Sequence, residues 1–199
     1  MIRKLLQTTT KASFVLAGLA FAAVPLAASA ANTTVNVDVA GVISTFTTSG
    51  TVTLGALTPD ATGRQSTNTD VVTVSTNDGD GFTLTLQDAD ATRTLVSGGN
   101  SFAASAGTPA VPITLVNNAW GWRVDGLSSF GAGPGAVISN AVPSALTYAG
   151  IPANASPFTL ATTAAPGSDV TDVWYSARAN DTQPTGTYTD IVTYTATVN

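Results

Sequence analysis

The sequence predicts an all-β protein, an antiparallel β-sandwich of the immunoglobulin-like or Greek-key type. β-branched Thr and Val are abundant after residue 30, while the long straight-chain residues that favour helices are nearly absent. Apolar and polar residues alternate with a period of two wherever a period can be read, and no apolar stripe has helical spacing. Turn residues separate about ten such stretches, a pattern typical of sandwiches.

Each predicted strand has one apolar and one polar face, as in antiparallel sheets with one solvated side. The stretches are residues 35–39, 52–56, 72–74, 82–86, 120–124, 173–177 and 188–198. The clearest predicted hairpin covers residues 71–87, with its turn at 77–81, where Gly and Asp tolerate positive φ. Residues 97–112, 126–144 and 161–168 are rich in small residues and are predicted to be long loops.

The N-terminus has the three regions of a secretory signal peptide. Arg3 and Lys4 precede an apolar run at residues 14–24, and Ala28-Ser29-Ala30 has the form of a cleavage site. We therefore expect residues 1–30 to be a signal peptide and residues 31–199 to be a single domain that is secreted or held at the cell surface. No membrane span is expected after cleavage, and the absence of cysteine excludes both a lipid anchor and a disulfide.

The composition excludes most kinds of catalytic, metal and haem site. The chain has no His, no Cys and no Glu, and after residue 30 it has twelve aspartates against four arginines and no lysine. General acid–base and nucleophilic catalysis lose their usual residues, and so do zinc and haem sites. Nothing selects two of the aspartates as a glycosidase pair. We expect no enzyme, no cofactor and, because of the negative charge, no nucleic-acid partner.

The C-terminal stretch, Gln183-Pro-Thr-Gly-Thr-Tyr-Thr-Asp-Ile-Val-Thr-Tyr-Thr195, resembles the closing strand of spore coat protein U, of fimbrial-type subunits and of WxL-type bacterial surface domains. Gly81-Phe82-Thr83-Leu84 and Tyr194-Thr195-Ala196 stand where WxL domains have their two tryptophan motifs, with other aromatic residues replacing the tryptophans. The resemblance implies a bacterial surface β-sandwich whose partner is cell-wall polysaccharide or peptidoglycan.

The same residues have a structural interpretation. Gly186-Thr187-Tyr188 before the last strand predicts a tyrosine corner, in which the hydroxyl bonds to upstream backbone. The alternation predicts that Tyr194 faces the core and packs near Phe82, with Leu84 on the same face. These residues are therefore expected to be structural.

Two acidic pairs, Asp78 with Asp80 and Asp88 with Asp90, flank one predicted strand. A strand of this length separates them by roughly 20 Å, so they cannot share one ion. Neither pair completes a calcium-binding loop. We interpret all four as turn residues and expect no metal site.

The tryptophans and one phenylalanine are the candidate ligand-binding residues. Trp120 and Trp122 alternate as a core stripe does. Trp174 alternates with Val173 and Tyr175, so one of these two faces is expected to be the outer one. Phe130 lies in a long small-residue loop and is expected to be exposed. Trp174 and Phe130 are therefore the residues expected to stack on a sugar, if any do.

Three functions are compatible with this sequence. The first is an exported, non-catalytic surface protein with a structural or adhesive role, which binds the cell wall non-covalently. The second is a pilin-like subunit that donates the stretch at residues 33–39 to the sheet of a neighbouring copy. The third is a carbohydrate-binding module that uses Trp174 and Phe130.

Overall fold

The computed structural model describes residues 34, 36–47 and 50–199, so the predicted signal peptide lies outside the described residues. The chain divides into two units, Met1–Asp38 and Val39–Asn199, and all the strands belong to the second. Every regular element among the described residues is a strand, which confirms the all-β class. In this part of the chain no helix is long and apolar enough to cross a membrane.

Twelve strands follow one another along the described chain. They are β1 (Ile43–Thr47), β2 (Arg64–Thr76), β3 (Phe82–Asp88), β4 (Leu95–Ser97), β5 (Asn100–Ala104), β6 (Ile113–Thr114), β7 (Ala119–Val124), β8 (Ile138–Ala141), β9 (Thr147–Tyr148), β10 (Phe158–Thr162), β11 (Gly167–Ala179) and β12 (Val192–Val198).

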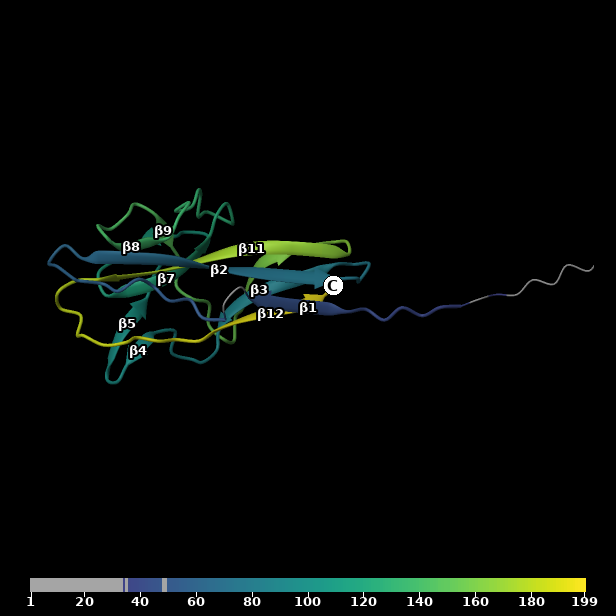
Figure 1. Ribbon diagram of the computed structural model, residues 1–199, viewed down its shortest axis with the longest axis horizontal. Coiled ribbons are helices and arrows are strands. Elements are labelled where there is room, and N and C mark those ends of the chain that lie inside the picture. Colours follow the sequence, from purple (N-terminus) through teal and green to yellow (C-terminus); the bar gives the residue numbers. More distant parts are fainter. Residues whose placement is uncertain (1–33, 35, 48–49) are drawn as a thin grey trace, which may run out of the picture. The chain divides into compact units, whose positions relative to one another are not determined.

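The strands form a large sheet, a small sheet and a short pair. The large sheet has the order β1-β2-β11-β7-β5-β4, with β8 also paired to β2, and the small sheet has the order β10-β3-β12. β6 pairs with β9. All pairings are antiparallel except that of β5 with β7. Figure 1 shows the two longest strands, β2 and β11, side by side, and their register extends from Gly167↔Thr76 to Ala179↔Arg64.

The prediction of a hairpin at residues 71–87 is wrong. Both of its strands form, but β2 belongs to the large sheet and β3 to the small one, so the turn at residues 77–81 carries the chain between sheets. Gly81 has a φ of 80°, and an added Cβ would contact the backbone of Thr163, which precedes β11. Alternation shows that a strand has one buried face, but it does not identify the strand that pairs with it.

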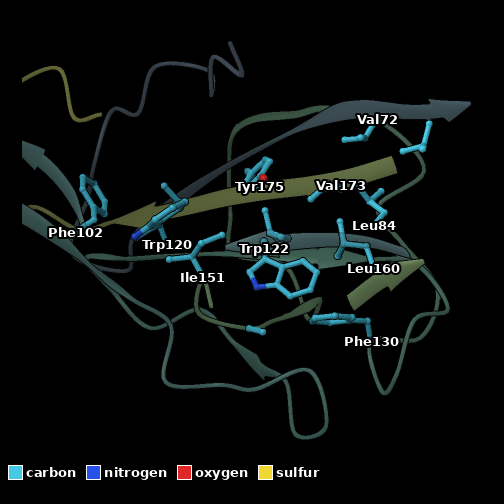
Figure 2. Packing of buried hydrophobic residues seen from close by; sticks show 14 of the residues in the cluster. Val72, Leu84, Phe102, Trp120, Trp122, Phe130, Ile151, Leu160, Val173 and Tyr175 are labelled. Atoms are coloured by element: carbon cyan, nitrogen blue, oxygen red, sulfur yellow. The ribbon is translucent and has the colours of Figure 1, made fainter. Parts of the chain in front are cut away.

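One hydrophobic cluster joins the two sheets. Phe82, Leu84 and Leu86 of β3 pack in the same cluster as apolar residues of β2, β7 and β11. Figure 2 shows Trp122 in this cluster, with Phe130 and Leu160 nearby. Complete burial of each large apolar side chain stabilises the fold by about 1.5–3 kcal/mol. The prediction that Trp120 and Trp122 are core residues is confirmed.

The outer face of the large sheet is also covered, over β2 and β11. Gln65, Thr67 and Ser176 are buried there and share hydrogen bonds of 2.8–2.9 Å. The Tyr148 hydroxyl from β9 lies 3.3 Å from both Gln65 Nε2 and Thr67 Oγ1, and the Ser144 N–H donates to Gln65 Oε1. These polar residues are buried because each has partners in the segment around β9.

Several predicted segments differ from the structure. The predicted loops at 97–112 and 126–144 contain β5 and β8, and the predicted strand at 52–56 forms no ladder although Val52 and Leu54 are partly buried. In the predicted strand at 33–39, the described residues lie in no strand, and β1 begins only at Ile43. Extended conformation and alternation are local properties, whereas a ladder requires a partner strand.

Gly121, between the two core tryptophans, allows a close approach of two strands. Trp122 exchanges two backbone hydrogen bonds of 2.9 Å with Ala149. A Cβ on Gly121 would lie 2.5 Å from the Ala149 carbonyl oxygen and 3.2 Å from the Cβ atoms of Ser105 and Tyr148.

We therefore expect Gly121→Ala to lower the free energy of unfolding by about 1–3 kcal/mol, because backbone and packed side chains would have to shift. Urea denaturation of the purified protein measures this change. Gly79→Ala is the matched control, since nothing lies within 4 Å of its added Cβ. Equal midpoints for the two variants would show that β7 can move away from Ala149 without loss of stability.

Candidate functional site

The two residues proposed to bind sugar are both buried. Phe130 is 4% exposed and Trp174 is 8% exposed, so the expectation that Phe130 is exposed is wrong. The Phe130 ring packs edge-on against Trp122, with 5.3 Å between ring centroids. Both faces of β11 are covered at this point, because Val173 and Tyr175 are buried as well as Trp174. Neither ring presents a free face for stacking on a sugar.

Arg123 explains why Phe130 is buried. Its guanidinium is fully buried, and Nη2 donates to the carbonyl oxygens of Phe130, Gly131 and Ala132 at 3.0, 3.1 and 2.6 Å. Nη1 donates to the Thr147 carbonyl at 3.3 Å, and Nε donates to Asp125 at 3.1 Å. The alternation assigned Arg123 to a solvated face, and no local signal in the sequence identifies it as a buried hydrogen-bonding centre.

The predicted tyrosine corner is present. The Tyr188 hydroxyl donates to the Pro184 carbonyl at 2.7 Å, four residues upstream. Its ring meets Phe102 edge-on, with 4.8 Å between centroids. Gly186 lies between the two bonded residues, near the Ser97 side chain. The hydrogen bond fixes the chain direction before β12, which is the structural role expected of these residues.

Tyr194 faces the core, as predicted, but it does not pack near Phe82. In the β3–β12 ladder Tyr194 pairs with Leu86, and Phe82 pairs with Val198 at the far end. The two aromatic residues are four positions apart along the ladder, which is roughly 13 Å. Tyr194 instead shares a 2.7 Å hydroxyl–hydroxyl hydrogen bond with Tyr175. Burial raises the pKa of both phenols, and the negative charge of Asp70 raises them further.

The acidic pair Asp78 and Asp80 has the geometry of a turn. Asp78 Oδ1 accepts the Asp80 N–H at 3.0 Å, and the Thr76 hydroxyl accepts the Asp78 N–H at 3.0 Å. These local bonds support the interpretation of this pair as turn residues.

The second acidic pair is joined by a third carboxylate, from Asp190. Asp88, Asp90 and Asp190 each offer a carboxylate oxygen, and these oxygens all lie within 4.8 Å of one another. The pairing of Asp88 with Val192 brings the end of β3 to the residues just before β12. We call these three residues the acidic cluster.

One oxygen of each carboxylate in the acidic cluster accepts a local N–H. Asp88 Oδ1 accepts from Asp90, Asp90 Oδ1 accepts from Thr92, and Asp190 Oδ1 accepts from Ile191, at 2.6–2.8 Å. The other oxygen, Oδ2, of Asp88 and of Asp190 is buried and has no hydrogen-bond partner among the residues that the structure describes. These two oxygens remain available to a ligand.

The burial and the closeness of the three carboxylates shift the pKa values in the acidic cluster. Burial raises the pKa of Asp88; the hydrogen bond from the Asp90 N–H lowers it, the charge of Asp90 raises it, and the charge of Arg93 lowers it. Burial raises the pKa of Asp190 to about 6, and the charges of Asp88 and Asp90 act in the same direction. Hydrogen bonds from Thr92 lower the pKa of Asp90. The cluster favours a positive charge among its carboxylates, whether a proton or a cation.

A cavity of about 230 Å³ lies beside the cluster, lined by Asp90, Thr92, Thr189 and Asp190 among others. Asp88 and Asp90 are recognisable in the sequence as an acidic pair, whereas Asp190 belongs to the predicted closing strand. The sequence predicts strands at 82–86 and 188–198 but not that they pair, and only their antiparallel pairing places the end of one beside the start of the other.

Comparison of this chain with protein-family models, with curated proteins and with solved structures finds no match.

Proposed function

We propose that this chain is an exported, non-catalytic protein of the bacterial cell surface with a structural role, and that its copies assemble by strand donation. The export part follows from the signal-peptide pattern of residues 1–30. The surface part follows from the resemblance to WxL-type and spore coat protein U-like proteins, which also makes cell-wall polysaccharide or peptidoglycan a partner. The non-catalytic part follows from a chain without His, Cys or Glu.

The proposed architecture is an immunoglobulin-like, Greek-key β-sandwich. Its support is the single cluster that residues of the large and the small sheet share, including Val72, Leu84 and Tyr175. The passage of the chain from β2 in one sheet to β3 in the other is also typical of sandwich topologies.

The observation that carries the assembly proposal is an alternating apolar segment at residues 36–39, which precedes the hydrogen bonds that Ala40 and Val42 make with Asn77. These residues lie in no strand. Val37 is 78% exposed and Val39 is 79% exposed, with polar residues between and before them. An extended segment of this pattern can add to an open sheet edge, where backbone hydrogen bonds provide affinity and alternate side chains enter pockets.

The proposed acceptor is the open edge of β10 in a second copy. β10 pairs with β3 on one side and has no further partner in the small sheet. A cavity of about 410 Å³ beside it is lined by Leu127, Leu160 and Val170 together with Asp169 and Asp172. The apolar walls of this cavity suit the donated valines. Asp169 and Asp172 would repel Asp38 of the donor segment, so assembly should become stronger as added salt screens this repulsion.

The test compares the exported chain with a V37D/V39D variant by size-exclusion chromatography and unheated gel electrophoresis. We expect a heat-labile ladder for the exported chain and a folded monomer for the variant, since both valines are exposed. Intact mass spectrometry of the same sample should give a start at Ala31 or Asn32.

V111D/V142D is the matched control, because these valines are also largely exposed, at 69% and 66%, but lie outside the segment. It should keep the ladder. A clean monomer of the exported chain at high concentration and high salt would overturn strand donation. Binding of that monomer to isolated cell wall would then favour the adhesive role. No observation favours a carbohydrate-binding module at Trp174 and Phe130, because both rings are buried.

A further inference from the structure

We propose that Asp88, Asp90 and Asp190 form a calcium site that links the end of β3 to the start of β12. This inference goes beyond the proposed function, and its test does not depend on assembly. It replaces the expectation of no metal site, which considered only the carboxylates adjacent in sequence.

The dimensions of the acidic cluster suit calcium. Ca²⁺ binds oxygen ligands at about 2.3–2.6 Å, so ligands on opposite sides of the ion are about 4.6–5.2 Å apart. The three carboxylates each present an oxygen within 4.8 Å of the others. Mg²⁺ requires a tighter octahedron, with opposite ligands about 4.0–4.2 Å apart, and is the poorer match.

A second observation points to a ligand, namely the burial of Asp88. Its side chain has no exposed surface, and its Oδ2 has no hydrogen-bond partner. Asp190 Oδ2 is likewise buried and without a partner. A buried carboxylate oxygen is normally paired, hydrogen-bonded or bound to a metal. The described ion pairs, Arg64 with Asp60 and Arg123 with Asp125, involve none of the three residues.

The surroundings can complete the ion's shell and balance its charge. Calcium takes six to eight oxygens, and three carboxylates supply three to six of them. The adjoining cavity of about 230 Å³ has room for water next to Asp90 and Asp190. A divalent ion leaves one negative charge among the three carboxylates, and Arg93 is close enough to act on Asp88.

The location of the site assigns it a role. Asp88 is the last residue of β3 and pairs with Val192, the first residue of β12. The Ala89 N–H donates to the Ile191 carbonyl at 3.0 Å, and Thr189 exchanges backbone hydrogen bonds with Val96. An ion bound here ties residues 88–90 to the segment at residues 189–192, so it should raise the melting temperature and protect residues 189–192 from hydrogen exchange.

The experiment uses the exported chain carrying V37D/V39D, so that assembly does not alter melting, in chelator-treated buffer. We expect addition of CaCl₂ to raise Tm saturably, by about 5–10 °C at a hundredfold excess over Kd, with a smaller effect of MgCl₂. Tb³⁺ binding should give sensitised luminescence, because the Trp120 indole N–H donates to the Arg93 carbonyl near the site.

Two variants and a control make the test specific. Asp90→Asn and Asp190→Asn should abolish the Tb³⁺ signal and the calcium shift, and neither residue is fully buried, so both variants should fold. D78N/D80N removes the other acidic pair and should change neither readout. Absence of a shift up to 10 mM CaCl₂, or a shift that survives in Asp190→Asn, would overturn the proposal.

Discussion

Replacing Arg123 with methionine should lower the free energy of unfolding by about 3–5 kcal/mol, the range found when one partner of a buried charged network is removed. Methionine fills much of the same volume but donates no hydrogen bond. The carbonyl oxygens of Thr147, Phe130 and Ala132 would lose the Arg123 donor, while that of Gly131 keeps its bond from the Gly126 N–H. Each buried acceptor left without a partner costs about 1–3 kcal/mol.

Arg123→Lys should recover little of this loss, because an ammonium is a compact charge that cannot reach carbonyls on several sides as a planar guanidinium does. Urea denaturation gives the stability change, and hydrogen exchange should show faster exchange confined first to residues 126–135. Arg64→Met is the control, because Arg64 forms a partly exposed ion pair with Asp60, worth about 0–1 kcal/mol. Similar midpoints for the Arg123 and Arg64 variants would contradict the central role of Arg123.

Phe82→Ala should cost about 3–5 kcal/mol, because the ring is fully buried in the cluster that joins the sheets. Tyr194→Ala should cost about 2–3 kcal/mol, since its ring is only partly buried but its hydroxyl bonds to Tyr175. The stability losses of the two single variants should add in the double variant to within about 0.5 kcal/mol, because Phe82 and Tyr194 lie four positions apart along the β3–β12 ladder.

A second mutant cycle provides the contrast. Tyr175→Phe and Tyr194→Phe remove the two hydroxyls that share one hydrogen bond, and their combined effect should differ from the sum by at least about 0.5 kcal/mol. Chemical denaturation of the four single variants and two double variants measures both cycles. Strong coupling between Phe82 and Tyr194 would mean that β12 pairs with β3 in another register.

The positions of many strands could be predicted from the sequence, because side-chain alternation is a local property. Phe82, Leu84 and Leu86 are buried with the predicted period, and so are Val173, Tyr175 and Ala177. The alternation failed at Arg123, which it assigned to a solvated face, and at Trp174, where one of the two faces of the strand was expected to be the outer one. Both are buried because residues distant in sequence cover them. Alternation with a period of two does not show whether the second face of a strand is also covered.

The candidate site could be predicted only in part. Asp88 and Asp90 were recognisable as an acidic pair after a strand, and the turn geometry of Asp78 and Asp80 followed from their residue types. Asp190 could not be assigned to the cluster without the antiparallel pairing of β3 with β12. A site built from both ends of a long-range ladder is visible only when the ladder is known.

The sequence by itself determined the all-β class, the core position of Trp120 and Trp122, the tyrosine corner at Tyr188 and the absence of His, Cys and Glu. These properties depend on composition and on neighbours within a few residues. Only the tertiary structure decided that β2 and β3 belong to different sheets, that Arg123 is buried among the carbonyls of residues 130–132, and that Asp190 joins Asp88. The physical reason is that pairing and burial depend on contacts between segments far apart in the chain, where many partners satisfy the same local pattern and the packing of the whole fold selects one.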